Sequence, residues 1–254
     1  MLIKHDLSDR RFDGIGFEDF AHMANDQSLS PNEKIGFPDR YRDGFVDAIY
    51  ADLCVKLPAL TRSGVTIADV GPGCSELPRR FHDRALHLDQ RLIWIDSAPM
   101  LAQLPDQGVE KLAARFPEGC IDWCSRHAGM LDVLIAYSVL QYVFAEGNIW
   151  AFLDQALSLL APGGAMLLGD IPNVSKRKRF LSTVAGETFH RAFMGVDEPP
   201  QVHYSVPEPG LIDDAVLLGL VARARAAGFD AYLMPQPPTL PMANRREDLL
   251  ITHP

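Results

Sequence analysis

The sequence predicts an α/β protein in which helices cover both faces of a mostly parallel sheet. From Val65 onward, short apolar runs alternate with amphipathic segments, as strands alternate with helices in such folds. A glycine turn, Gly71-Pro72-Gly73, directly follows the first apolar run. The run from Leu131 to Tyr137 is almost continuously apolar, as expected for a central strand that is covered on both faces.

Seven strands and four helices are expected after residue 60. The strands are expected at residues 65–70, 91–96, 119–122, 131–137, 165–170, 229–234 and 247–252. The helices are expected at residues 75–84, 98–102, 148–160 and 211–227. The first strand is rich in β-branched residues, the fourth is almost continuously apolar, and the third has the weakest signal.

Local signals justify the ends of these helices. Ser97 is placed to cap the second helix. Between Asn148 and Leu160, apolar residues recur on one helical face, and Pro162-Gly163-Gly164 is expected to end that helix. Gly228 stops the last helix, and the two apolar runs after it are interpreted as a terminal pair of strands joined by a proline-rich loop.

Two regions lie outside this alternation. Residues 1–60 are predicted to form a helical N-terminal cap, followed by a core that spans residues 61–254. Residues 172–210, rich in proline and charge, connect the fifth strand to the last helix. Because connections of this length inside a compact domain are usually functional, we expect this insertion to be a substrate lid.

The composition narrows the classes of function. A chain of 254 residues, 47% of them hydrophobic, can bury a full core without staples, so its four cysteines are expected to be reduced thiols and no metal is expected. The net charge of −9 argues against a nucleic-acid partner. The apolar stretches are too short to span a membrane and the amino terminus has no signal-peptide core, which predicts a cytoplasmic protein without a membrane partner. A homo-oligomer is compatible with this composition.

The segment from Asp69 to Ser75 carries the strongest functional signal. Gly71 and Gly73 let the backbone turn tightly at the carboxyl end of a strand and approach a ligand closely. A dinucleotide fingerprint has a further glycine where this chain has Glu76, whose charge would face a pyrophosphate. The Asp69 carboxylate suits a cationic ammonium group better than a phosphate. By itself, the turn also fits nicotinamide or flavin binders, or a tight turn without a ligand.

In its motifs and their order, the chain resembles the class I S-adenosylmethionine-dependent methyltransferases. The glycine turn after Asp69 is similar to the family's first motif, with Ser75 where many members have a third glycine. Later segments resemble the family's other strand motifs in the same order: residues 95–101, 121–123, 131–143, 160–164 and 246–251.

This resemblance implies a Rossmann-like sheet of seven strands, mostly parallel with an antiparallel last strand, and S-adenosyl-L-methionine as the cofactor. Asp96 is then expected to accept hydrogen bonds from both ribose hydroxyls, Asp122 to contact the adenine amino group, and Trp123 to lie against the adenine ring. The residues expected at the cofactor are Asp69, Gly71, Pro72, Gly73, Ser75, Asp96, Ser97, Met100, Asp122, Trp123 and Tyr137.

The predicted acceptor is a small molecule that is methylated on an oxygen or nitrogen atom. Residues 136–139 replace the Asn-Pro-Pro-Tyr-like motif that many DNA and protein methyltransferases carry. The basic run 176–179 suits a phosphate or carboxylate clamp, although a solvated start of a helix explains it as well. The candidate substrate-binding residues are Lys176, Arg177 and Arg179. The candidate general bases are His190, His203 and Tyr142.

Three interpretations of the function remain. Residues 170–173, beside the basic run, are similar to methyltransferases of bacterial surface-sugar and polysaccharide biosynthesis. An NAD(P)-dependent oxidoreductase would share the turn but needs the glycine that is absent at Glu76. A non-catalytic module that binds S-adenosylmethionine would keep the cofactor motifs and lack a working acceptor chamber.

Overall fold

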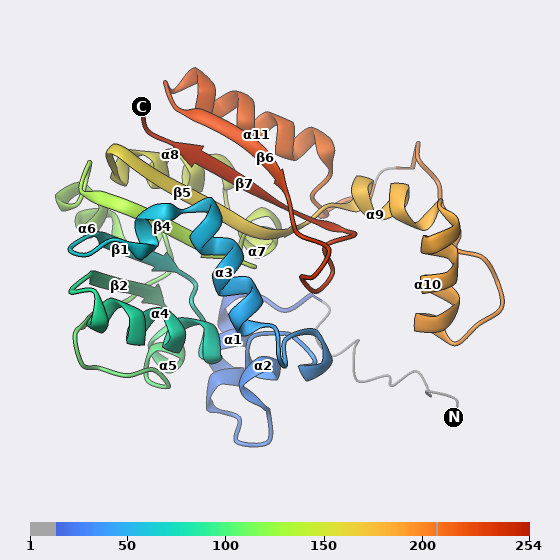
Figure 1. Ribbon diagram of the computed structural model, residues 1–254, viewed down its shortest axis with the longest axis horizontal. Helices are drawn as coiled ribbons and strands as arrows, with labels where there is room; N and C mark the ends of the chain where they lie inside the picture. The colour runs from blue at the N-terminus through green and yellow to red at the C-terminus, as the bar shows by residue number, and fades with distance from the viewer. Residues whose placement is uncertain (1–13, 207) are drawn as a thin grey trace.

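Seven strands form one sheet in the order β3-β2-β1-β4-β5-β7-β6 in the computed structural model, which describes residues 14–206 and 208–254 (Figure 1). The strands are β1 Thr66–Val70, β2 Arg91–Asp96, β3 Val109–Ala113, β4 Leu131–Tyr137, β5 Leu160–Pro172, β6 Asp230–Pro235 and β7 Arg246–Thr252. The first five strands pair in parallel, and β7 runs antiparallel between β5 and β6. The predicted fold class is therefore confirmed.

Helices cover both faces of this sheet, and short helices precede its first strand (Figure 1). They are α1 Phe17–Asn25, α2 Pro31–Lys34, η2 Asp39–Tyr41, α3 Val46–Lys56, η3 Pro58–Thr61, α4 Glu76–His87, α5 Ala98–Leu101, η4 Glu118–Cys120, α6 Ile121–Arg126, α7 Leu140–Glu146, α8 Ile149–Leu159, α9 Val174–Leu181, α10 Val184–Met194 and α11 Asp214–Ala226. We call α1, α2 and α3 the cap helices. Helices α9 and α10, in the insertion, project away from the sheet (Figure 1).

The alternation of side chains along each strand produces two cores. In β2, Leu92 and Trp94 pack with α3 and α4, whereas Ile93 and Ile95 pack on the opposite face with α6, α8 and α11. These strand residues are at most 1% exposed. Because both faces are buried, the strands must be apolar throughout, which is the pattern seen in the sequence.

The third strand is not where the sequence analysis placed it. Strand β3 is Val109–Ala113, and the expected strand at 119–122 is instead the end of η4 and the start of α6. Cys120, Trp123 and Cys124 are buried at helical spacing, while Asp122 is exposed. The apolar residues of this segment therefore form one face of a helix rather than a buried strand.

The start of β5 also differs from the expectation. Helix α8 ends at Leu159, and Pro162-Gly163-Gly164 lies inside β5 instead of terminating the helix. Leu160 already pairs with Leu131 of β4, and a Cβ atom on Gly164 would lie 2.6 Å from the Leu131 carbonyl oxygen. A glycine is needed here because the two strand backbones approach each other closely.

A buried ion cluster ties α3 to the last strand. Lys56 Nζ donates to Asp52 Oδ2 and to Asp248 Oδ2, each at 2.6 Å. The side chain of Lys56 is 5% exposed and that of Asp248 is fully buried. Two carboxylates thus share one ammonium group in the interior, where the loss of any partner leaves an uncompensated charge.

Three further findings concern the described residues. No helix in residues 14–206 or 208–254 is long and apolar enough to cross a membrane. Within the same ranges, no cluster of three or more histidine, cysteine or acidic side chains is arranged to hold a metal ion. All four cysteines are free thiols.

Candidate active site

The glycine turn follows β1 at the carboxyl edge of the sheet. Gly71 and Gly73 have φ angles of +70° and +66°, which favour glycine. A Cβ atom on Gly71 would lie 2.7 Å from Val139 Cγ2, and one on Gly73 would lie 2.5 Å from Ile35 Cγ2. Larger residues would therefore be strained and crowded here, and the turn presents bare backbone to the space above it.

Two buried carboxyl groups flank this turn. Asp96, at the end of β2, accepts hydrogen bonds from the backbone amides of Gly73 at 3.0 Å and Ser97 at 2.6 Å. Burial raises the pKa of Asp96 to about 6, although these hydrogen bonds oppose the shift. Burial, and then the charge of Asp96, raises the pKa of Asp69 to about 8. A positively charged ligand bound beside these two carboxyl groups would therefore stabilise their ionised forms.

A cavity opens above the turn and reaches the cap helices. Of the residues predicted to contact the cofactor, those lining it are Asp69, Gly71, Pro72, Gly73, Ser75, Asp96, Met100 and Tyr137. The candidate base Tyr142 also lines it. Ser97 lines a neighbouring pocket, and its buried Oγ has no hydrogen-bond partner within the described part of the chain. Ser97 does stand at the N-cap of α5, but without the expected side-chain hydrogen bond.

Asp122 and Trp123 do not line this cavity, because they lie on α6 instead of at a strand end. Asp122 is exposed, and the indole Nε1 of Trp123 donates to Glu110 Oε1 at 2.9 Å. The residues that follow β3 and do line the cavity are Ala114, Arg115 and Phe116. The structure therefore does not bring Asp122 and Trp123 to the cavity that the other predicted cofactor residues line.

The cap helices and their connections cover the cavity. Phe20 of α1 packs edge-on against Tyr142 of α7, with ring centroids 4.8 Å apart. Glu146 Oε2 accepts from the backbone amide of Phe17 at 3.2 Å, at the start of α1, and lies 3.4 Å from Arg115 Nη2. Helix α1 is thus held over the strand ends by contacts to α7, which also contacts the loop after β3.

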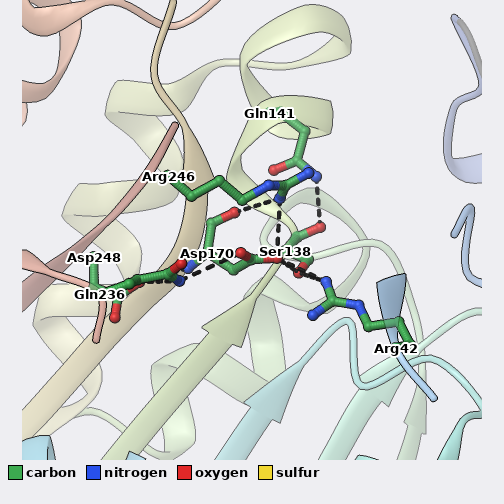
Figure 2. A network of polar contacts seen from close by, with 7 residues as sticks. All are labelled: Arg42, Ser138, Gln141, Asp170, Gln236, Arg246 and Asp248. Atoms are coloured by element: carbon green, nitrogen blue, oxygen red, sulfur yellow. Dashed lines mark hydrogen bonds and ion pairs between the residues drawn. The ribbon is translucent and has the colours of Figure 1, made fainter. Parts of the chain in front are cut away.

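Arg42, in the connection that precedes α3, lines the cavity. It belongs to a buried polar network, shown in Figure 2. Arg42 Nη2 donates to Asp170 Oδ2 and to Ser138 Oγ, each at 2.7 Å. Arg246 Nη1 donates to the same oxygen of Asp170 at 2.9 Å, and Ser138 Oγ donates to it at 2.5 Å. Asp170 and Ser138 both have left-handed backbone conformations, with φ angles of +56° and +62°. One fully buried carboxylate therefore orients two arginines.

Charge and burial together determine whether Asp170 in this network is ionised. Burial would raise the pKa of Asp170, but the charges of Arg246 and Arg42 outweigh it and keep the pKa below its ordinary value. The guanidinium of Arg42 lies 3.9 Å from the ring centroid of Phe37. Within the described residues, its buried Nε has no hydrogen-bond partner. Arg42 was missed in the sequence analysis, and its orphaned donor is the clearest sign of a binding role.

The four basic side chains at residues 176–179 of α9 form hydrogen bonds and ion pairs within the chain. Lys176 Nζ donates to the Arg246 carbonyl oxygen at 2.7 Å. The next two cations, Arg177 and Lys178, pair with Glu208 at 2.7 and 2.9 Å, and Arg179 pairs with Asp214. None of these four cations lines the cavity. The predicted clamp for an anionic substrate is thus not brought to the site.

The two candidate histidines also lie away from the cavity. His190 is half-buried on α10, and His203 is exposed in the segment after it. Tyr142 is the one candidate base among the three that reaches the cavity, and burial raises the pKa of its phenol above the ordinary value. A phenol of this kind stays protonated near neutral pH and donates a hydrogen bond.

Comparisons with known proteins rest on solved structures, because no family model and no curated protein sequence matches the chain. The plantazolicin methyltransferase BpumL, solved with a triazolic desmethylPZN analog and SAH, is similar with a TM-score of 0.56 and 13% identity over 85% of this chain and 87% of that chain. A SAM-dependent methyltransferase from Aquifex aeolicus is similar with a TM-score of 0.52 and 11% identity over 89% of this chain and 100% of that chain. The CurJ carbon methyltransferase is similar with a TM-score of 0.50 and 16% identity over 88% of this chain, which spans 61% of that chain.

The chain has the Rossmann-like fold of class I methyltransferases. The similar proteins are methyltransferases of different kinds. The similarity therefore identifies the fold of this chain and does not identify an acceptor. Nothing in these three structures supports the expected link to polysaccharide biosynthesis.

Proposed function

We propose that this protein transfers the methyl group of S-adenosylmethionine to an oxygen or nitrogen atom of a small molecule. The observation that carries the proposal is the cavity at the carboxyl edge of the sheet, where a bare glycine turn, two buried carboxyl groups and an arginine with an unpaired donor face one space. Similar structures were solved with SAH, the product that this cofactor leaves.

The residues that line the cavity fit the cofactor group by group. Asp96 lies on β2 and has the acceptor geometry for two ribose hydroxyls. Asp69 lies on the neighbouring strand β1 and suits the positively charged amino group. The segment of Ala114, Arg115 and Phe116, after β3, would surround the adenine.

Arg42 is suited to the carboxylate of the cofactor's amino-acid part. It is hydrogen-bonded to Ser138, just after β4, which pairs with β1 on the side opposite β2. A ligand whose ribose is at β2 and whose chain crosses the glycine turn of β1 therefore ends near β4, about two strand spacings or ~10 Å away. A guanidinium with a free Nε is a strong partner for a carboxylate there.

The chain's own residues would mainly position the reactants and exclude water. S-adenosylmethionine, held by the residues named above, would supply a sulfonium methyl group for transfer to the acceptor's oxygen or nitrogen; the electron pair of the broken bond would stay on sulfur, and the acceptor's proton would pass to solvent. The cap helices cover the cavity, and the apolar rings of Phe20 and Phe37 exclude water from it. Tyr142, as a protonated phenol, would orient the acceptor by donating a hydrogen bond.

The direct test is calorimetric titration of the full chain with S-adenosylmethionine, S-adenosylhomocysteine and NADH. Binding of the two adenosyl compounds without NADH is the expected result. Binding of NADH alone would replace the proposal with hydride transfer. A protein that binds S-adenosylmethionine tightly, yet transfers no labelled methyl group to any compound of a broad acceptor library, would instead be a binding module.

Arg42→Met is expected to weaken the binding of S-adenosylhomocysteine about 10- to 100-fold, which corresponds to one hydrogen bond to a charged group. The variant should leave the binding of 5′-methylthioadenosine nearly unchanged, because that nucleoside has no carboxylate. Calorimetry on both ligands measures the difference. Arg177→Met, which removes an arginine outside the cavity, is the matched control and should alter neither affinity. An equal loss for both ligands would contradict the carboxylate assignment.

S-adenosylmethionine is expected to bind more tightly as the pH rises from about 6 to about 8. The carboxyl group of Asp69 has a pKa of about 8 in the unliganded protein, so it is mostly protonated below that pH. A cationic ligand favours the ionised form, and binding therefore releases a proton; the affinity should rise by up to about tenfold per pH unit. Titrations at several pH values measure this slope. In Asp69→Asn the contribution of this group should vanish; a slope that persists unchanged would point to another titrating group.

A further inference from the structure

Strand β5 contains a β-bulge close to its carboxyl end. Up to Leu168, each paired residue of β5 faces one residue of β7, and from Ile171 onward the register is shifted by one. Gly169 and Asp170 therefore lie opposite a single residue, Asp248. A bulge of this kind bends the strand and redirects a side chain, and bulges are frequent beside functional sites.

The bulge has an uncommon backbone conformation. Asp170 is left-handed, with a φ angle of +56°, whereas its neighbour Gly169 is not. A Cβ atom on Gly169 would lie 2.5 Å from Cδ2 of Tyr137, so this glycine serves the close packing of β5 on β4. Ser138, which donates to Asp170, is also left-handed, with a φ angle of +62°. Two hydrogen-bonded residues other than glycine in this conformation indicate a functional constraint, because the surroundings must stabilise the strain.

Three side chains that do not line the cavity hold Asp170 in place (Figure 2). Asp248 Oδ1 accepts a hydrogen bond at 2.7 Å from the Asp170 amide, which the bulge leaves outside the regular ladder. Arg246 Nη1 donates to the Asp170 carbonyl oxygen at 2.7 Å and to Oδ2 at 2.9 Å. Gln236 Nε2 donates to Asp248 Oδ1 at 3.0 Å and to Asp170 Oδ1 at 3.3 Å. Both aspartates are fully buried, so the loss of one of these bonds would leave a buried polar group unpaired.

The carboxylate held in this way directs Arg42. Its Nη2 donates to Asp170 Oδ2 and to Ser138 Oγ, which fixes the orientation of the guanidinium. Nε, which has no hydrogen-bond partner in the described part of the chain, is thereby left for a ligand. Arg42 and Ser138 line the cavity, whereas Asp170 and Asp248 lie behind its wall. Asp248 is thus connected to the cavity only through other side chains.

Resting on the methyltransferase function and on the carboxylate assignment of Arg42, we propose that Asp248 is a positioning residue for cofactor binding. Its hydrogen bond to the Asp170 amide fixes the bulge, and the bulge fixes the direction of the Arg42 guanidinium. The contribution is specific to ligands with a carboxylate, because Arg42 is not assigned to the ribose or the adenine. The role requires an oxygen acceptor but not a charge, since a side-chain amide oxygen accepts the same hydrogen bond.

The experiment measures the affinities of full-chain variants for S-adenosylhomocysteine and for 5′-methylthioadenosine. Asp248→Leu removes the acceptor and should weaken S-adenosylhomocysteine at least about tenfold, while 5′-methylthioadenosine changes less than about threefold. Asp248→Asn keeps an oxygen acceptor and should bind both ligands within about threefold of the parent chain. Lys56→Met is the matched control, because it removes the buried ion-pair partner of Asp248 and leaves the bond to the Asp170 amide. The ratio of the two affinities should stay unchanged in this control.

A double variant provides the same test in case Asp248→Leu does not fold. Lys56→Met combined with Asp248→Leu removes both members of the buried ion pair, which proteins tolerate better than the loss of one member. Relative to Lys56→Met alone, it should show the same loss of at least about tenfold for S-adenosylhomocysteine only.

Three results would each overturn the inference: an unchanged affinity for S-adenosylhomocysteine in the leucine variants, an equal loss for both ligands, or an equal loss in Asp248→Asn. A parent chain that does not bind S-adenosylhomocysteine would reject the proposed function together with the inference. If the parent binds it and Arg42→Met binds it equally well, the carboxylate assignment fails and the inference fails with it, while the cofactor itself is retained.

Discussion

Asp96→Ala is expected to weaken the binding of S-adenosylhomocysteine by about 100- to 10,000-fold, the largest effect of any single change at the site. Two hydrogen bonds from ribose hydroxyls to a charged acceptor are each worth about 1.5–3 kcal/mol, and both are lost together. The same carboxylate accepts from the backbone amide of Gly73, so its removal also deletes one hydrogen bond between the glycine turn and β2, while the Gly71 amide still donates to the Ile95 carbonyl oxygen. Calorimetry gives the dissociation constants, and near-ultraviolet circular dichroism verifies that the variant is folded.

Asp122→Ala is the informative control for this experiment. Asp122 is a further acid that the sequence motifs connect to the cofactor, but it is exposed on α6 outside the cavity. We expect its replacement to leave the affinity unchanged. If Asp96→Ala kept an affinity within about threefold of the parent chain, the ribose assignment would be rejected. A strong loss in Asp122→Ala would instead indicate that the segment around α6 reaches the ligand.

Lys56→Met is expected to lower the free energy of unfolding by about 3–5 kcal/mol. The change leaves the carboxylates of Asp52 and Asp248 buried without their shared ammonium partner. Asp248 still accepts the backbone amide of Asp170, so one carboxylate keeps part of its hydrogen bonding. Urea denaturation followed by circular dichroism measures the loss as a lower transition midpoint at an unchanged slope.

Arg223→Met is the control for the buried cluster. Arg223 pairs with Asp154 on the surface, where the two side chains are 52% and 43% exposed, and solvent screens such a pair. Its replacement should leave the transition midpoint nearly unchanged. Equal midpoints for Lys56→Met and the parent chain would mean that the buried cluster rearranges or takes up water at little cost.

The sequence predicted most of the sheet because central strands carry a strong signal. Strand β4, buried on both faces, is almost continuously apolar and was located at its observed bounds. Strand β3 was missed because it is the edge strand of the sheet, half-exposed along its length, and includes the polar residues Glu110 and Lys111. The strand was expected instead at residues 119–122, which belong to the end of η4 and the start of α6.

The candidate site was predictable only where its residues are local in sequence. Gly71, Gly73 and Asp96 lie at or just after the ends of predicted strands, and they line the cavity as expected. Arg42 carries no local signal, because its position depends on Ser138 and Asp170, which are 96 and 128 residues away. The basic run of α9 misled the sequence analysis for the complementary reason: its partners, Glu208 and Asp214, follow about 30 residues later.

Arg42 and Lys56 contact residues far along the sequence. These distances set the order in which the contacts can form during synthesis. Lys56 reaches the ribosome's exit long before Asp248, which is 192 residues further along, and Arg42 precedes Arg246 by a similar interval. The glycine turn and Asp96 are therefore made early, while the wall that orients Arg42 is completed only when β7 pairs with β5. A nascent chain that ends before β7 lacks Arg246, so the buried network that orients Arg42 cannot be complete until the last strand has been made.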